Sequence, residues 1–192
     1  MSSTKKILIS AFICVALIQL YVPARMIWDR EQVLTLGKEY LFETAPIDPT
    51  DPFRGKYIQL NFEAANYPIE DKDDWTNGAS IYLTFSENGD GLAEIETVSQ
   101  KKPMDTPYFL KAKVDYVTYD DVLMITYPFE RFYMEESKAY EAEQQYNLSV
   151  QGDTTLTYAV VHIMEGSAVL KDVRINNISI QEWVERSRSE KE

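Results

Sequence analysis

An uncharged, largely apolar run at residues 7–22 constrains this chain more than any other feature. Two lysines precede the run and two arginines follow it. A basic stretch followed by an apolar one is typical of a signal peptide or a signal anchor. If the helix continues to Trp28, it approaches the ~20 residues that cross the hydrocarbon core of a bilayer. We therefore expect an N-terminal transmembrane helix.

Three fates of this segment compete. A retained signal anchor is favoured, with Arg25 and Trp28 at the far interface. A cleaved signal peptide is the second, because Ala24 offers a small residue at a cleavage point, although Pro23 sits awkwardly there. A buried core helix is the third. The favoured alternative assigns residues 1–30 to a cytoplasmic stub and anchor, and residues 31–192 to one extracytoplasmic domain.

Charge is distributed unevenly along the chain. The net charge is −12, but residues 1–30 hold four basic residues and one acidic residue, whereas the remainder holds 15 basic and 30 acidic residues. A domain with such an acidic surplus does not suit nucleic-acid binding. One Cys and one His exclude a disulfide framework, a Cys-rich zinc site and a multi-His metal centre. We expect no cofactor and no metal.

The body of the chain alternates between apolar and polar residues, as half-buried strands do. The expected strands are residues 57–62, 80–85, 92–98, 111–116, 122–127, 155–164 and 168–175. Asn88-Gly89 and residues 165–167 predict hairpin turns. Residues 132–145 and 180–188 predict short helices. The fold class is therefore mainly β (α+β): a single antiparallel β-rich domain with one or two short helices, after the N-terminal helix.

The sharpest local signature is residues 46–62, which read PIDPTDPFRGKYIQLNF. Three prolines in seven residues exclude a helix or a central strand, so we expect a stiff loop that leads into a strand. The candidate binding surface comprises Asp48, Asp51, Pro52, Phe53, Arg54, Gly55, Tyr57 and Leu60. The aspartates either fix turns of this loop or present a ligand or partner surface, and Arg54 can pair with them.

This signature resembles the GDYXXLXY family of bacterial membrane-anchored proteins, whose pattern is PVDPRDPFRGDYVxLxY. The chain departs from it at Thr50, Lys56 and Phe62. Residues 127–136 and 158–175 resemble the second and last blocks of the family. The resemblance implies anchoring in the bacterial inner membrane and a multi-pass membrane protein as partner, but no biochemical activity. Lys56 supplies an amine where the family pattern has a carboxylate after the glycine.

Two functions follow as hypotheses. We favour a non-enzymatic binding or accessory protein that acts with an integral membrane partner through the proline-rich loop. The alternative is a carboxylate-based cell-envelope hydrolase or glycan-binding protein, in which Asp48 and Asp51 point into an open cleft lined by tyrosines. A purely structural assembly subunit would instead show a flat apolar patch without a cleft.

Other polar residues favour structural roles. Residues 71–74 contain three aspartates, but they lack the spacing of a calcium loop and are expected in a solvated loop. Asn88 and Asp90 are expected at a hairpin tip. His162 lies in an apolar strand, where a hydrogen-bonded structural histidine is expected rather than a catalytic one.

Overall fold

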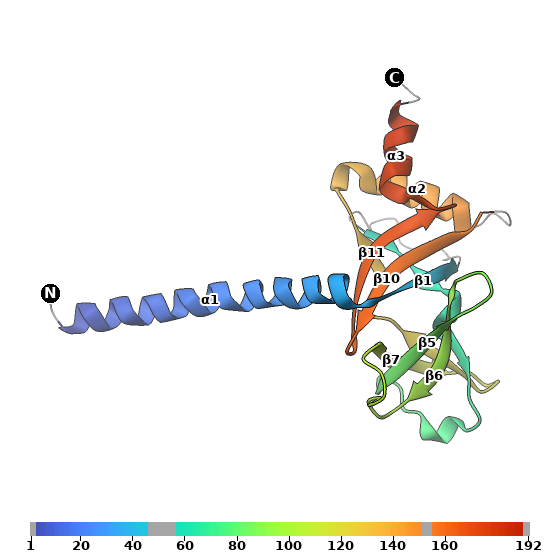
Figure 1. The fold of residues 1–192 in the computed structure, drawn as a ribbon, viewed down its shortest axis with the longest axis horizontal. Coiled ribbons are helices and arrows are strands. Elements are labelled where there is room, and N and C mark those ends of the chain that lie inside the picture. Colours follow the sequence, from blue (N-terminus) through green and yellow to red (C-terminus); the bar gives the residue numbers. More distant parts are fainter. Residues whose placement is uncertain (1–2, 46–56, 151–154, 190–192) are drawn as a thin grey trace.

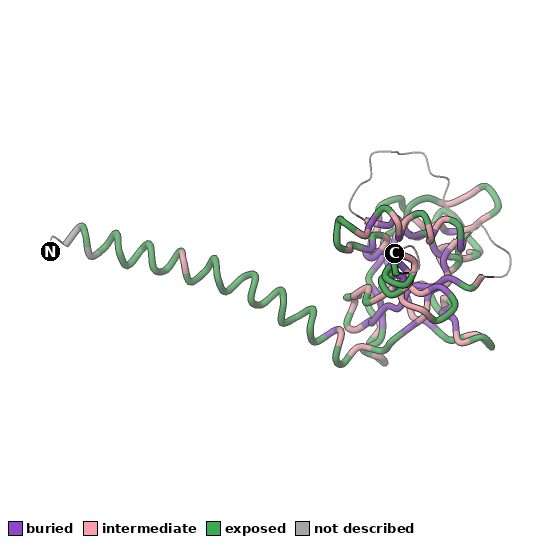
Figure 2. Tube along the Cα trace, turned by 90° about the horizontal axis from the view of Figure 1, so that it is seen from above, coloured by how far each residue is buried: buried purple, intermediate pink, exposed green. Residues whose placement is uncertain are grey.

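The computed structural model describes residues 3–45, 57–150 and 155–189. Helix α1 (Ser3–Leu36) projects away from a β-rich domain (Figure 1). Its 34 residues rise by about 1.5 Å each, so it is about 51 Å long. Its described side chains are exposed almost throughout, and Val33 in its last turns is buried against the domain (Figure 2). The segment Ile7–Leu36 is long and apolar enough to cross a membrane.

Within the described residues, the domain contains two five-stranded antiparallel sheets. The first has the order β12 (Ile178–Ser179), β11 (Ser167–Ile175), β10 (Thr157–Met164), β1 (Lys38–Ala45) and β3 (Asn61–Phe62). The second has the order β4 (Asn66–Pro68), β8 (Val122–Thr126), β7 (Phe109–Val117), β5 (Ser80–Glu87) and β6 (Ala93–Ser99).

A two-stranded ribbon and several helices complete the domain. The ribbon pairs β2 (Tyr57–Gln59) with β9 (Arg131–Tyr133). The helices are α2 (Glu136–Val150), α3 (Ile180–Ser189) and the short 3₁₀ helices η1 (Glu63–Ala65) and η2 (Lys72–Asp74). Figure 1 shows α2 and α3 at one end of the domain, β5, β6 and β7 at the other, and β1, β10 and β11 between them.

A cluster of aromatic rings joins the two sheets at their common core. Phe42 of β1 is fully buried, and its ring centroid lies 5.0–5.7 Å from those of four other aromatic residues. These are Phe62, Phe85, Tyr127 and Phe129. Edge-on aromatic pairs stabilise a core by about 0.5–1.5 kcal/mol beyond the area they bury. The cluster therefore ties β1, β3, β5 and the segment after β8 to one another.

The structure confirms the β-rich domain after an N-terminal helix, with strands near each expected position. The expected strand at residues 57–62 alternates in burial as predicted, but it divides at Leu60: β2 joins the ribbon and β3 joins the first sheet. The expectation that a helix begins at Phe132 is wrong. Phe132 is buried between exposed Arg131 and Tyr133, a strand periodicity, and α2 begins at Glu136. Strand β1 was not expected.

Gly37 is the single residue between α1 and β1. Its N–H donates to the carbonyl oxygen of Val33 at 3.0 Å. A Cβ atom at this position would lie 2.4 Å from that oxygen and 3.1 Å from the carbonyl oxygen of Ile163. Both neighbours are backbone atoms, which cannot rotate away as a side chain can. The direction in which α1 leaves the domain is therefore fixed by a close contact that only glycine allows.

We predict that Gly37→Ala lowers the free energy of unfolding of the full-length protein by about 1–3 kcal/mol, because backbone must shift to admit the methyl group. Denaturant titration in detergent, followed by tryptophan fluorescence, measures the change. Gly89→Ala is the matched control, since a Cβ there meets no atom within 4 Å. Equal losses in the two variants would contradict the tight junction.

Candidate functional site

The structure describes two of the eight residues predicted for the binding surface, Tyr57 and Leu60. The other six, Asp48, Asp51, Pro52, Phe53, Arg54 and Gly55, lie outside the described residues, as does Lys56. The predicted ion pair of Arg54 with Asp48 or Asp51, and the orientation of these two aspartates, therefore stay predictions. The strand that follows these residues is described, and its contacts locate the described end of the motif.

Leu60 belongs to the core rather than to a binding surface. Its side chain is fully buried, and its N–H donates to the carbonyl oxygen of Glu130 at 2.8 Å. Glu130 directly precedes β9, so this bond continues the contact between the motif strand and residues 127–133. Two of the three segments that carry the family resemblance, residues 46–62 and 127–136, are thus adjacent in space where the structure describes them.

Tyr57 lies at the end of the ribbon, directly opposite Tyr133. The centroids of the two rings are 5.5 Å apart, and the guanidinium carbon of Arg131 lies 4.9 Å from the centroid of Tyr57. Cations bind aromatic faces at this distance. A hydrogen bond with Tyr133 also raises the pKa of the exposed Arg131 guanidinium. Tyr57, Arg131 and Tyr133 therefore form one group that combines two tilted aromatic rings with a cation.

A cleft of about 640 Å³ opens beside this group. We call it the motif cleft; it is lined by Arg30 of α1, residues 127–133, residues 168–171 of β11 and Gln181 of α3. Its lining contains three cations, Arg30, Arg131 and Lys171, and one carboxylate, Glu130. Lys171 also lies 3.6 Å from Glu39. In a strongly acidic domain the cleft is locally basic, and it suits an anionic group better than a cation.

Glu130 is the half-buried carboxylate of the motif cleft. Its Oε1 accepts a hydrogen bond from the N–H of Tyr127 at 2.9 Å. Burial raises the pKa of Glu130, the charge of Asp115 adds to the rise, and the bond from Tyr127 opposes it. Burial likewise raises the pKa of the Tyr127 hydroxyl, which donates to the carbonyl oxygen of Ala64 and stays neutral.

Glu130 also lines a second, smaller cavity of about 340 Å³. We call it the carboxylate cavity. Asp115, Tyr116 and two asparagines, Asn61 and Asn66, line it as well. It therefore brings together two carboxylates that the sequence did not single out.

The remaining polar candidates occupy structural positions. His162 is 9% exposed, and its Nε2 lies 3.1 Å from a carboxylate oxygen of Glu39. Asp71 accepts from the N–H of Asp73 at 2.9 Å at the start of η2. Asn88 accepts from the N–H groups of Asp90 and Leu92, both at 3.0 Å, in the β5–β6 turn. No group of three or more His, Cys, Asp or Glu residues in the described part of the chain is arranged to hold a metal ion.

A family model described as GDYXXLXY protein matches residues 19–173. The chain belongs to the GDYXXLXY family. The match begins within α1 and ends in β11, so it spans the last turns of the helix and most of the described domain. No curated protein and no solved structure shows significant similarity to the chain. The geometry of this GDYXXLXY domain therefore carries the functional argument.

Sequence reasoning missed part of the motif cleft. Glu130, Arg131 and Tyr133 were identified as a second family block, but not as neighbours of Tyr57. Arg30 was assigned to the flank of the anchor, and Lys171 and Gln181 carried no sequence signal. The one available signal was the strand-like alternation at residues 131–133, which would have placed a partner strand for the motif.

We predict that the pH dependence of stability changes in Glu130→Gln. Because the folded state raises the pKa of Glu130 above its unfolded value, the folded chain binds this proton more tightly, and stability falls as pH rises through the folded pKa. Gln keeps the acceptor for Tyr127 but cannot ionise. The wild type should therefore lose stability relative to the variant as pH rises above about 4, near the unfolded glutamate pKa, until Glu130 is ionised in the folded state as well.

Denaturant midpoints across this range provide the measurement. Glu63→Gln on η1 is the matched control, because it removes the charge of an exposed glutamate. A Glu130→Gln curve that runs parallel to those of the wild type and of the control would contradict the raised pKa of Glu130.

Proposed function

We propose that this GDYXXLXY protein is a retained single-pass protein of the bacterial inner membrane. Its domain lies outside the membrane and binds an integral membrane partner through the motif cleft. One observation carries the proposal: Arg30 of the membrane helix lines the same cleft as Arg131 and Tyr133, which hold the motif residue Tyr57. The binding surface is thus continuous with the anchor.

The position of Arg30 favours a partner within the membrane over a soluble one. Arg30 follows Trp28, the residue expected at the interface, by two positions, a rise of about 3 Å along the helix. The near end of the motif cleft therefore lies at the level of the lipid headgroups. A soluble ligand would have to approach through them, whereas an extracytoplasmic loop of a multi-pass protein is already there.

The chemistry of the cleft indicates which part of the partner binds. Three cations surround one half-buried carboxylate, so an acidic side chain on the partner gains favourable charge contacts. Arg131 and Tyr133 lie at its exposed rim, and arginine and tyrosine are the residues that often dominate binding energy. We therefore expect an acidic, loop-borne ligand.

We predict that a photo-crosslinking amino acid at Tyr133 captures a membrane protein in native membranes. Tyr133 is 64% exposed at the cleft rim, so its replacement should leave the core intact. Arg131→Ala should reduce the yield of the adduct by about tenfold, the effect of about 1.4 kcal/mol. Arg54→Ala should reduce it as well if the proline-rich loop belongs to the same surface.

Tyr119 is the matched control position. It is also tyrosine, it is fully exposed, and it does not line the motif cleft. The proposal predicts an adduct at Tyr133 that is absent at Tyr119. Identical adducts at both positions, or none at Tyr133 in cells that express the full chain at its natural level, would contradict it.

The carboxylate cavity favours a second candidate function, glycan binding with or without hydrolysis. Paired carboxylates perform acid and base roles in glycosidases, and tyrosine and asparagine side chains bind sugars through stacking and hydrogen bonds. The carboxylates that line this cavity are Asp115 and Glu130, whereas the predicted Asp48 and Asp51 lie outside the described residues. The raised pKa of Glu130 suits a proton donor.

This second function predicts that insoluble cell-wall glycan retains the detergent-solubilised protein. Asp115→Asn should then release it, with a loss of about tenfold in affinity. Asp90→Asn is the control, since Asp90 is an exposed aspartate in the β5–β6 turn outside the cavity. Equal retention of the wild type and both variants, or no retention of the wild type, would exclude the glycan site.

A further inference from the structure

The loop between β6 and β7, residues 100–108, is a second basic feature of this acidic domain. It contains Lys101 and Lys102, both exposed, against the single carboxylate of Asp105. Met104 is 100% exposed at its tip. Among the described residues, neither lysine forms an ion pair; the Nζ of Lys102 lies 5.3 Å from the ring centroid of Phe109. The loop thus presents two cations that have no ion-pair partner among the described residues, beside an exposed apolar side chain.

Backbone contacts place this loop on the side of the domain from which α1 leaves. Pro107 accepts a hydrogen bond from the N–H of Glu165 at 2.7 Å, which fixes the loop against the β10–β11 turn. That turn lies just beyond Ile163, the β10 partner of Lys38. Lys38 begins β1, one residue after Gly37 and α1. Figure 1 shows the β10–β11 turn next to the junction with α1.

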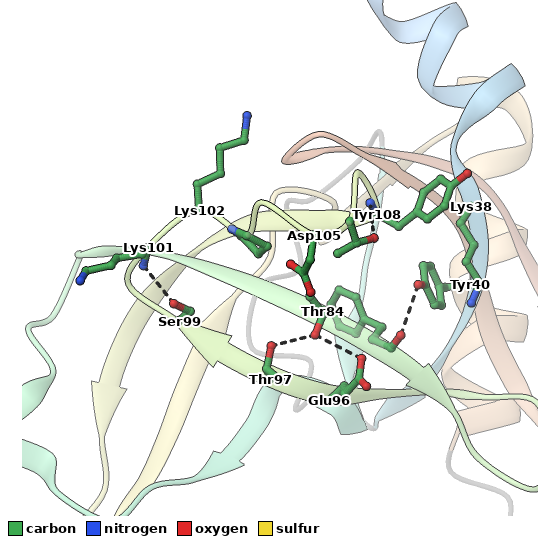
Figure 3. A pocket seen from close by; sticks show the side chains of 13 residues that line it. Lys38, Tyr40, Thr84, Glu96, Thr97, Ser99, Lys101, Lys102, Asp105 and Tyr108 are labelled. Carbon is green, nitrogen blue, oxygen red and sulfur yellow. Dashed lines mark hydrogen bonds between the residues drawn. The ribbon is translucent and has the colours of Figure 1, made fainter.

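A cavity of about 570 Å³ connects the loop with the start of β1 (Figure 3). Lys38 contributes to its wall, but its Nζ is engaged by Glu87 at 3.1 Å and by the ring of Tyr40. Glu96, which accepts from the Thr84 hydroxyl at 3.3 Å, and Asp105 are its carboxylates. In Figure 3 the side chain of Lys102 extends away from the cavity, on the side from which the α1 ribbon leaves.

The length of α1 beyond the membrane brings the loop within reach of lipid headgroups. From Trp28 to Leu36 the helix rises about 12 Å. The headgroup layer occupies about 5–8 Å of that distance. The distance that remains between the headgroups and the domain is shorter than the Debye length of about 8 Å at physiological salt. A typical helix tilt of about 20° brings one side of the domain closer to the membrane.

We propose that residues 100–108 contact anionic lipid headgroups of the leaflet from which α1 emerges. Lys101 and Lys102 supply the charge, and Met104 supplies an apolar contact at the interface. This inference rests on the proposed anchoring by α1. Because the domain as a whole is acidic and is repelled by an anionic surface, a basic loop on this side favours the tilt that brings residues 100–108 towards the membrane.

The test uses the full chain with Cys14→Ser and Met104→Cys, labelled with an environment-sensitive fluorophore and reconstituted into vesicles. We expect the emission to move to shorter wavelength in phosphatidylcholine mixed with phosphatidylglycerol, but not in phosphatidylcholine alone. Lys101→Glu with Lys102→Glu should abolish the shift, and so should high salt. Lys72→Glu with Lys113→Glu makes the same change in charge at exposed sites outside the loop and should preserve it.

A label at Tyr119→Cys serves as the positional control, because Tyr119 follows the opposite end of β7 and should stay in water in both vesicles. Flotation separates failure of the two proposals. Protein that does not float with vesicles contradicts anchoring by α1. Protein that floats while its label at position 104 stays in water, or shifts equally in both lipid mixtures, overturns the loop contact alone.

Discussion

The contact of Gly37 with the backbone of Val33 and Ile163 determines the orientation of the domain relative to α1. Membrane anchors are often joined to their domains by flexible linkers, which leave the orientation of the domain open. Here α1 passes through one residue into β1, the strand that pairs with β10 and β3 and carries Phe42 into the aromatic cluster. The helix and the core are therefore mechanically one unit, and the motif cleft and the basic loop keep fixed positions relative to α1.

Leu60 has a comparable role within the family motif. Its burial holds the end of the motif strand in the core, so that the strand can leave the ribbon and join the first sheet. Tyr57, three residues earlier, remains at the surface between Arg131 and Tyr133. The motif thus combines Leu60, which stabilises the core, with Tyr57, which offers an aromatic side chain at the surface. Substitution of Leu60 would act through the core, whereas substitution of Tyr57 would act at the surface.

Much of the fold follows from local patterns. The turn at Asn88 closes the predicted hairpin because the side chain of Asn88 accepts two backbone N–H groups. Alternation of apolar residues identified β5 and β7, the apolar run at residues 122–127 identified β8, and the turn at residues 165–167 identified β10 and β11, each near its observed position. The prediction that a helix begins at Phe132 was wrong. The glutamates and alanines that follow favour a helix locally, whereas β9 forms by pairing with β2, which is distant in the sequence. Tertiary pairing overrode local propensity at Phe132 and Tyr133.

The sequence by itself determined that an apolar N-terminal helix precedes a β-rich domain of the GDYXXLXY family, because hydropathy, alternation and the proline-rich motif are local properties of the chain. Only the tertiary structure decided that Arg30, Glu130 and Lys171 share a cleft, and that Asp115 faces the same cavity as Glu130. These residues come from four separate segments of the chain, and no periodicity links them. The core that packs Phe42 and Leu60 sets their distances, and with them the chemistry available at the surface.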